Sequence, residues 1–270
     1  MNAKAGPIAI TVKALFSIAY GLPIFWIVLT SFKSASDVFG GNALLFTPTL
    51  SAYERAINPQ LFTALGQSAL IATGTTVLVL LIAVPAAYGL ARVSGWIATL
   101  GLGLLIVLQM LPQTAQVIPL FALLGSWGIL DQTGTVILAD AALLIPFATL
   151  LLRPFFRSVP PSLEEAGALD GAGPLRSFWS IALPIARNGI LTVASITFLQ
   201  SWGEFLYAVR FFLTPQNYPL SALLSQQVSA FGIDWPGLMA LAVLTSIPIL
   251  IVFMSTYRML RDGLTVGAVK

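Results

Sequence analysis

Apolar residues form long stretches along this chain, and charged residues fall mostly between them. Residues 56–91, 93–130 and 236–257 contain no charged side chain. A bilayer core about 30 Å thick is crossed by about 20 apolar residues as a helix, whereas barrel strands alternate apolar and polar positions. That alternation is absent here. The pattern predicts an all-α polytopic membrane protein with six spanning helices, at about residues 14–32, 63–91, 97–124, 133–152, 188–209 and 237–257.

Prolines fall inside five of these six predicted helices. Each removes a backbone hydrogen bond that lipid cannot replace, so the resulting kinks should face protein or water. Prolines are frequent in spanning helices generally, but five kinked helices together favour a transporter over a simple anchor. The prolines are Pro23, Pro85, Pro112, Pro119, Pro146 and Pro248.

Composition agrees with a single membrane domain over residues 1–270. The chain is 57% hydrophobic and 9% charged, against about a quarter charged in soluble domains. Without Cys or His, thiol nucleophiles, disulfides, His-based acid–base catalysis and the usual zinc sites are excluded, so we expect no catalytic or metal site. The phosphate-binding pattern G-x-x-x-x-G-K-[ST] is also absent, so any ATP that drives this protein must be hydrolysed by another chain.

Basic residues are distributed unequally between the two sides of the predicted bundle. Lys33, Arg55 and Arg210 fall on one side, and the others fall on the opposite side with both termini. Because basic loops favour the cytoplasm, both termini are predicted to be cytoplasmic. This asymmetry accounts for the net charge of +3 without a nucleic-acid partner. The basic residues on the predicted cytoplasmic side are Lys4, Lys13, Arg92, Arg153, Arg157, Arg176, Arg187, Arg258, Arg261 and Lys270.

One predicted cytoplasmic loop, residues 158–187, has a pattern of its own. A Pro-Pro pair ends the preceding helix, and Ser162 stands three residues before Glu165. That spacing is a capping box, which predicts a short helix over residues 163–170. Gly171 then supplies the backbone freedom that ends a helix.

A second loop helix is predicted over residues 174–182, with Pro184 ending it. Its surface is strongly apolar because it carries Phe178, Trp179 and Ile181. An exposed apolar surface of this kind favours a protein partner. The alternative is a helix that lies on lipid headgroups, with Trp179 as an interfacial anchor.

Residues at fixed spacing in this loop resemble the EAA motif of binding-protein-dependent ABC importer permeases. Glu165-Ala-Gly is followed after three residues by Gly171, and nine residues later by Ile181-Ala-Leu-Pro. The longer string, with Phe178, is similar to the carbohydrate-uptake branch, which includes the maltose-type permease subunits. Two positions depart from the pattern, since Gly167 replaces an alanine and Gly203 replaces an asparagine. Weaker matches elsewhere are Leu111-Pro-Gln, Ile118-Pro-Leu, Trp202-Gly-Glu-Phe and the terminal Gly263-Leu-Thr-Val-Gly-Ala-Val-Lys.

The resemblance implies a type I ABC importer permease fold, in a multi-pass protein of the bacterial cytoplasmic membrane that moves a carbohydrate. It implies four kinds of partner: a second homologous permease subunit, two ATPase subunits that bind ATP and Mg²⁺, an extracytoplasmic solute-binding protein and the carbohydrate itself. No cofactor is implied in this chain. Residues 158–187 would dock on an ATPase subunit, with Gly171 setting the angle between the loop helices, and residues 261–270 would touch the same subunits. The implied coupling residues are Glu165, Ala166, Gly167, Asp170, Gly171, Phe178, Ile181, Leu183 and Pro184.

Polar side chains also recur inside the predicted spanning helices. Three glutamines of the third helix share one helical face, Glu204 and Gln200 recur in the fifth, and Asp140 lies in the fourth. An acid at a helix centre costs about 2.5–3.5 kcal/mol to insert, so each needs water, a partner or a proton. We predict that they line a translocation path, in which amides and carboxylates bind sugar hydroxyls and an aromatic ring stacks on the sugar. The predicted path residues are Gln109, Gln113, Gln116, Asp140, Gln200, Trp202 and Glu204.

Other interpretations stay open at this point. The amides would equally form hydrogen bonds between helices, Glu165 would serve only as a helix cap, and Glu204 would pair with Arg210. A glycerophosphodiester or sugar phosphate is an alternative substrate, although the path offers few basic groups. Asp140 and Glu204 would also suit a proton-coupled secondary transporter or an intramembrane aspartyl enzyme, but neither class predicts the patterned loop.

Overall fold

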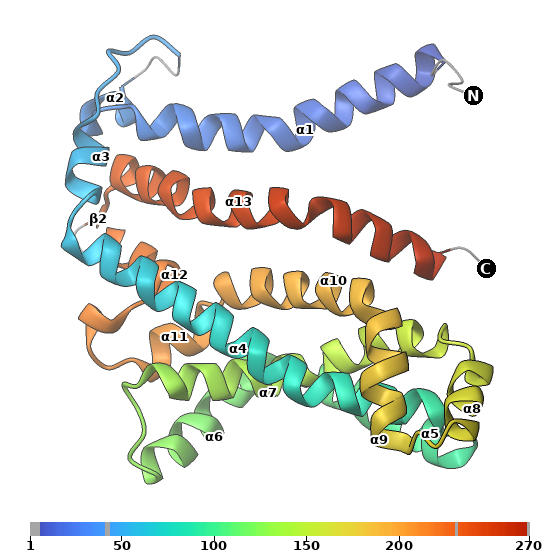
Figure 1. Cartoon of the computed structure of the whole chain (residues 1–270). Coiled ribbons are helices and arrows are strands. Elements are labelled where there is room, and N and C mark those ends of the chain that lie inside the picture. Colours follow the sequence, from blue (N-terminus) through green and yellow to red (C-terminus); the bar gives the residue numbers. More distant parts are fainter. Residues whose placement is uncertain (1–5, 41–43, 230–231, 269–270) are drawn as a thin grey trace. The chain divides into compact units, whose positions relative to one another are not determined.

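The computed structural model is almost entirely helical (Figure 1). It describes residues 6–40, 44–229 and 232–268, with side chains described for all of these except residues 7–9, 229 and 257–268. Within that part of the chain, five helices are long and apolar enough to cross a membrane, and a sixth crossing exists if the bent pair α5 (Trp96–Met110) and α6 (Gln113–Ser126) forms one span. The protein is therefore an all-helical polytopic membrane protein, as its apolar pattern predicted.

Contacts divide the chain into two compact units. One unit holds residues 1–62 and 223–247, and the other holds residues 63–222 and 248–270. Helices α4 (Pro59–Arg92) and α13 (Trp235–Ala268) each contribute to both units.

The first unit is held together by polar and aromatic contacts around the end of α1. The Ser31 hydroxyl and the Tyr53 hydroxyl form a hydrogen bond of 2.7 Å, and the rings of Phe32 and Tyr53 lie 5.2 Å apart. A short antiparallel hairpin pairs Val228 with Ile233. The elements of this unit are α1 (Pro7–Ser31), α2 (Ala35–Phe39), α3 (Ser51–Ala56), η3 (Leu224–Gln227), β1 (Val228–Ser229), β2 (Gly232–Ile233) and the first part of α13.

The second unit contains two apolar clusters along α7 (Thr133–Arg157). One cluster joins α4, α7 and α10 (Leu183–Trp202) around Leu152, Phe156 and Phe178. The other joins α4, α6 and α7 to α11 (Leu206–Phe211) around Val136 and Tyr207. The remaining elements are α8 (Pro161–Leu169), α9 (Pro174–Ser177), the π-helical turn η1 (Phe178–Ala182), η2 (Pro215–Asn217) and α12 (Leu220–Leu223), whose last residue belongs to the first unit.

The continuous helix predicted over residues 97–124 is wrong. The structure divides that range into α5 and α6, which meet at an angle of 89°. Leu111 lies between them in an extended conformation, with φ −68° and ψ 119°. Pro112 explains the break, because a proline disfavours helical geometry at the residue before it and has no N–H to donate.

The predicted end of a helix at Pro184 is also wrong. From Pro174 to Trp202 the helix is unbroken, and the π-helical turn η1 lies just before the proline. There the Leu183 N–H donates to the Phe178 carbonyl, one residue further back than in an α-helix. The widened turn accommodates a proline that would otherwise clash with the preceding turn.

Two further segments differ from the pattern. The helix predicted over residues 188–209 stops at Trp202 and resumes as α11 at Leu206. The half-apolar sequence of residues 220–231 is too polar to span and predicts one short interfacial helix. The described part instead forms α12, η3 and β1, and residues 230–231 lie outside the described residues. Helix α13 extends to Ala268, but the side chains of the predicted ATPase-contacting tail are outside the described part of the chain.

Candidate functional site

The loop of residues 158–187 folds as two helical pieces, but the predicted capping box does not form. Helix α8 begins at Pro161 with Pro160 at its N-cap position and without a side-chain cap. Ser162 therefore lies inside the first turn rather than before it, because the rigid Pro161 is already suited to the first helical position. Glu165 is exposed. The alternative that Glu165 only caps this helix is therefore not supported.

Gly171 ends α8 in a left-handed conformation, with φ +81°. The Ala172 N–H donates to the Gly167 carbonyl at 2.8 Å, and the Gly171 N–H donates to the Ala168 carbonyl at 3.0 Å. This pair of bonds is a Schellman motif, which needs a left-handed residue and therefore favours glycine. The geometry gives a physical reason for glycine at the point where the chain turns from α8 to α9.

The residues that the family resemblance singled out fall on two faces of this loop. Phe178 is buried and Ile181 is partly buried, and a Cβ placed on Gly167 would lie 2.7 Å from Cδ1 of Ile181. An alanine at this position would require the end of the Ile181 side chain to move. The inward-facing set is Gly167, Phe178, Ile181 and Leu183, and the exposed set is Glu165, Ala166, Asp170, Gly171 and Pro184.

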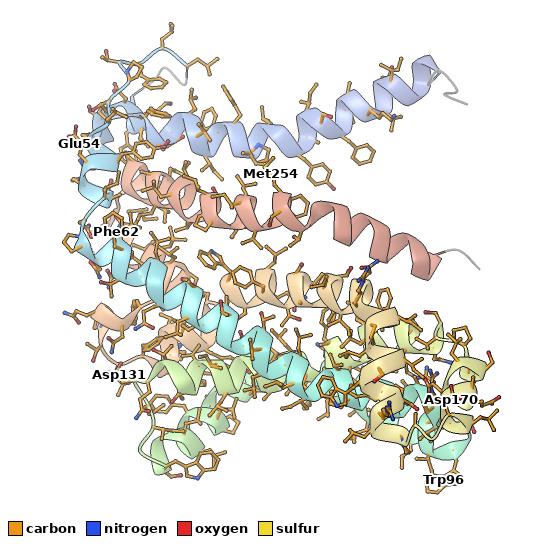
Figure 2. The ribbon with its side chains drawn as sticks, in the orientation of Figure 1. Glu54, Phe62, Trp96, Asp131, Asp170 and Met254 are labelled. Carbon is orange, nitrogen blue, oxygen red and sulfur yellow. The ribbon has the colours of Figure 1, made fainter. Side chains whose placement is uncertain are left out.

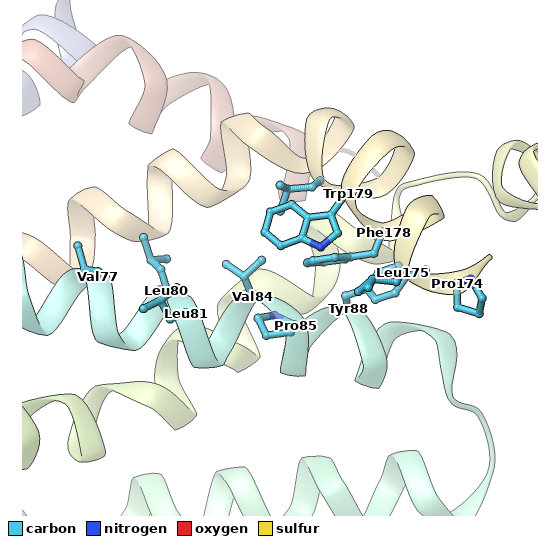
Figure 3. Close-up of a pocket in the computed structure, with 11 residues that line it drawn as sticks. Val77, Leu80, Leu81, Val84, Pro85, Tyr88, Pro174, Leu175, Phe178 and Trp179 are labelled. Atoms are coloured by element: carbon cyan, nitrogen blue, oxygen red, sulfur yellow. The ribbon is translucent and has the colours of Figure 1, made fainter. Parts of the chain in front are cut away.

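An apolar groove of about 720 Å³ runs between α4 and the start of the second loop helix (Figure 3). Phe178 and Trp179 stand over the α4 residues Val84 and Tyr88. The Phe178 and Trp179 rings meet edge to face at 5.3 Å, and Trp179 is 59% exposed. The loop therefore has one apolar side on the bundle and one exposed side at α8, where Asp170 lies near its tip (Figure 2).

An ion pair that the sequence pattern missed holds this loop to α4. The Arg92 guanidinium at the end of α4 binds both carboxylate oxygens of Glu164 in α8, with Nε at 3.1 and 3.2 Å and Nη2 closer still. The Tyr88 hydroxyl donates to the same carboxylate at 3.0 Å. The one available signal was an acidic residue in the first turn of α8, but the partner lies 72 positions away in the chain.

A second polar cluster surrounds the buried Glu204. Glu204 is 9% exposed and sits in the break between α10 and α11. Its carboxylate accepts the N–H groups of Tyr207 at 2.7 Å and Ala208 at 3.0 Å, and the Gln113 side-chain amide at 3.0 Å. The Tyr207 hydroxyl in turn donates to Gln116 at 3.3 Å. This cluster connects α6 to the start of α11.

Asp140 joins α7 to α10 beside that cluster. It is 2% exposed and accepts a hydrogen bond from the Ser201 hydroxyl at 2.5 Å. Of the predicted path residues, Gln113, Gln116, Asp140 and Glu204 are thus bound to neighbouring helices or helix ends. The ion pair suggested between Glu204 and Arg210 is absent from the described residues, where Arg210 is exposed.

The other three predicted path residues lie elsewhere. Gln109 and Gln200 are exposed, and Trp202 is buried with its ring 5.7 Å from that of Phe198. Gln109 does not share a face with Gln113 because the break at Leu111 separates α5 from α6. Among the described residues, acidic side chains form no group of three or more that would hold a metal ion.

Comparison with known proteins identifies the family. Residues 79–266 match the family described as the binding-protein-dependent transport system inner membrane component. The chain belongs to this family. This permease is 31% identical over 92% of its length to a sulfoquinovosyl glycerol transport system permease protein of Agrobacterium fabrum, of which 88% is covered. It is also 31% identical over 92% of its length to a trehalose transport system permease protein of Mycobacterium tuberculosis, of which 92% is covered.

A solved structure shows the same fold. It is a bacterial ABC transporter involved in the import of the acidic polysaccharide alginate, with a TM-score of 0.78 and 22% identity over 94% of this permease and 95% of that chain. Family membership makes the protein a multi-pass inner-membrane transport subunit rather than an enzyme, and implies ATPase and solute-binding-protein partners. The resemblance found in the sequence is therefore confirmed.

Proposed function

We propose that this permease is one membrane subunit of an ATP-driven importer that moves a carbohydrate, an oligosaccharide or related polar solute, into the cytoplasm. The relatives support this substrate class, since they include permeases for sulfoquinovosyl glycerol, trehalose and diacetylchitobiose. Its partners would be a second homologous permease subunit, two ATPase subunits that hold ATP and Mg²⁺, and the solute-binding protein. Both termini and residues 158–187 would lie in the cytoplasm.

The structured loop is the observation that carries this proposal. An exposed α8 ends in a Schellman turn at Gly171 and leads into a helix that continues to Trp202. A rigid projection continuous with a spanning helix is suited to transmit a displacement, whereas a flexible loop is not. Glu165, Ala166 and Asp170 would contact the ATPase subunit, because they lie on the exposed face of the loop.

The polar cluster supports a path near α6, α7 and α11. Asp140 and Glu204 are buried acids with hydrogen-bonding neighbours from several helices. Charged or polar groups within spanning segments usually face a bundle interior or a water-filled cavity. Gln113, Gln116, Asp140 and Glu204 would shape the path, and their donors and acceptors suit sugar hydroxyls.

The decisive experiment is purification of the tagged chain from its native membrane in mild detergent, with mass spectrometry of the proteins that copurify. We expect a Walker-motif ATPase and a second six-helix permease. Gly171→Asp should lose the ATPase, because it adds a charged side chain to the exposed turn that we expect to dock, and any side chain costs conformational energy at φ +81°. Gly173→Asp is the matched control, since Gly173 has φ −72°, open space around its Cα and the helix N-cap position that Asp favours.

Transport assays in proteoliposomes separate the remaining classes. Uptake that needs ATP and the binding protein supports the importer, whereas uptake by the chain alone with a proton gradient would contradict it. Competition by neutral oligosaccharides against sugar phosphates or glycerophosphodiesters tests the substrate class. Neutral sugars should compete better, because the described path residues are amides and acids rather than basic groups.

A further inference from the structure

Arg92 contacts three separate parts of the chain at one point. Beyond its ion pair with Glu164, its Nη1 donates to the Phe156 carbonyl at 3.1 Å, and its Nη2 donates to the Val159 carbonyl at 3.3 Å. Those carbonyls stand at the C-terminal end of α7 and in the turn that follows, whereas Glu164 stands in the first turn of α8. The guanidinium therefore spans the turn between α7 and α8 from the end of α4.

This arrangement restricts the direction of α8. A guanidinium is a planar fork, so simultaneous bonds to a carboxylate and two carbonyls fix its neighbours in orientation as well as distance. The Arg92 and Glu164 side chains are only 22% and 16% exposed, which reduces the solvent screening that weakens surface ion pairs. A cation near the last carbonyls of α7 also favours that helix end.

Tyr88 extends the same contact to the far end of the loop. Its ring lies 5.7 Å from the Phe156 ring in α7 and 5.0 Å from the Phe178 ring in the π-helical turn η1. The Arg92 guanidinium also lies over the Tyr88 ring at 5.5 Å. One turn of α4 thus contacts α7 and α8, which precede the turn at Gly171, and η1, which follows it.

We propose that Arg92, acting through Glu164, is a positioning residue that fixes the direction of α8 relative to α7. A push on α8 is then delivered to α4 and α7 together. Glu165 faces outward beside Glu164, so adjacent acids have different tasks: one holds the loop to its own bundle and one faces the partner. The transport consequence rests on the proposed function, but the positioning itself does not.

The test uses spin labels attached to introduced cysteines. The chain has no native cysteine, so only the introduced positions of this subunit are labelled. Cysteines replace Leu169, which is 91% exposed at the end of α8, and Gly89 in α4, whose Cβ would have nothing within 4 Å. Distances between the labels are measured by pulsed electron resonance in the purified complex, after the labelled protein is shown to transport. Arg92→Ala should broaden the distance distribution, Arg92→Lys should broaden it less, and Arg157→Ala is the matched control at an exposed arginine in the same region.

Transport and ATP hydrolysis are then measured on the same variants. Arg92→Ala should lower the solute moved per ATP hydrolysed by about 5-fold or more, the range of ordinary coupling energies between sites. Glu164→Ala should do the same, and the double variant should be no worse than Arg92→Ala alone. The ATPase should still copurify with all three, which distinguishes positioning from loss of assembly.

An unchanged distance distribution in Arg92→Ala would overturn the positioning role, whatever transport does. A broadened distribution with unchanged transport per ATP would overturn the coupling role. If the parent chain binds no ATPase at all, the proposed function fails, but the distance measurement still decides whether Arg92 sets the direction of α8.

Discussion

Glu204 shows how a buried carboxylate can build structure as well as a path. It accepts two N–H groups of α11 and the Gln113 amide, and it is 9% exposed. Glu204→Ala should therefore lower the free energy of unfolding by about 1–3 kcal/mol, because buried donors lose their acceptor. Thermal unfolding of the purified protein in detergent measures the change. Gln200→Ala is the control, since Gln200 is exposed and such surface changes stay within about 0.5 kcal/mol.

Glu204→Gln separates the structural role from a role in the path. The amide keeps one oxygen that can accept from the Tyr207 N–H and the Gln113 amide, so much of the stability should remain, while the carboxyl group is lost. Reduced transport at preserved stability would assign the carboxylate to the path. If Glu204→Ala leaves the unfolding temperature unchanged, the hydrogen bonds to Glu204 do not stabilise the protein and this prediction is wrong.

Asp131 organises the segment that follows α11. It has φ +64°, and its carboxylate accepts the N–H groups of Leu213 at 3.0 Å and Thr214 at 3.1 Å (Figure 2 places it beside the start of α7). The Thr214 hydroxyl and the Asn217 side-chain amide also donate to it. These bonds, led by the Thr214 hydroxyl, lower the pKa of Asp131 below its ordinary value of 3.8.

The lowered pKa predicts a pH dependence of this segment. Because the folded pKa is depressed, the stabilisation is present above the ordinary pKa and is lost as pH falls through the folded pKa. Amide hydrogen exchange at Leu213 and Thr214, corrected for the intrinsic pH dependence of exchange, should show protection that declines below about pH 4. Asp131→Asn keeps a residue that tolerates left-handed geometry but should remove this pH dependence, and Asp170→Asn should not. Protection independent of pH in the parent protein would contradict the assignment.

At the scale of elements, uncharged runs located the spanning helices but not their ends or breaks. The fourth helix was predicted to stop near residue 152, yet α7 continues to Arg157. A charge ends an apolar run without ending a helix, and Arg153 continues α7 while its Nε donates to the Leu90 carbonyl at 3.2 Å.

The candidate site was predictable where its pattern is local. The role of Gly171 in ending α8 could be inferred, because a left-handed helix end depends on neighbouring residues in the sequence. The choice between Glu164 and Glu165 could not, since the partner that distinguishes them is Arg92, far away in the sequence. Gln113 and Glu204 form a hydrogen bond, but the helix break that lets Glu204 accept the first N–H groups of α11 was not visible in a helical periodicity.

The close contact between α10 and α7 requires a glycine at position 189. A Cβ on Gly189 would lie 2.2 Å from Cγ of Phe155, closer than any real contact. Gly189→Ala should therefore destabilise the protein by about 1–3 kcal/mol through overpacking, despite the better helix propensity of alanine. Thermal unfolding should show no loss for the control Gly134→Ala, where nothing lies within 4 Å. Equal stability of the two variants would contradict the prediction, because α7 and α10 would then accommodate the added methyl group without cost.

At the scale of the whole molecule, the bent pair α5 and α6 decides the topology. Single cysteines at Ser94 and Ser126, both exposed, flank the pair in a chain without native cysteine. If the pair crosses the membrane once, a membrane-impermeant maleimide added to intact spheroplasts should label Ser126→Cys and should label Ser94→Cys only after permeabilisation. Labelling of the two positions from the same side would show a re-entrant pair and five spans.

The two topologies place residues 158–187 on opposite sides. With both α4 and α7 crossing, a re-entrant pair would bring the turn after α7 to the outer face if the N-terminus is cytoplasmic, where no ATPase subunit could reach α8. Six crossings put the same turn in the cytoplasm, together with the basic residues Arg153, Arg157, Arg176 and Arg187, as basic loops prefer. A third cysteine at the exposed Ser162 tests this directly, and it should be labelled only after permeabilisation. ATPase coupling through α8 thus requires that an 89° bend still forms one complete span.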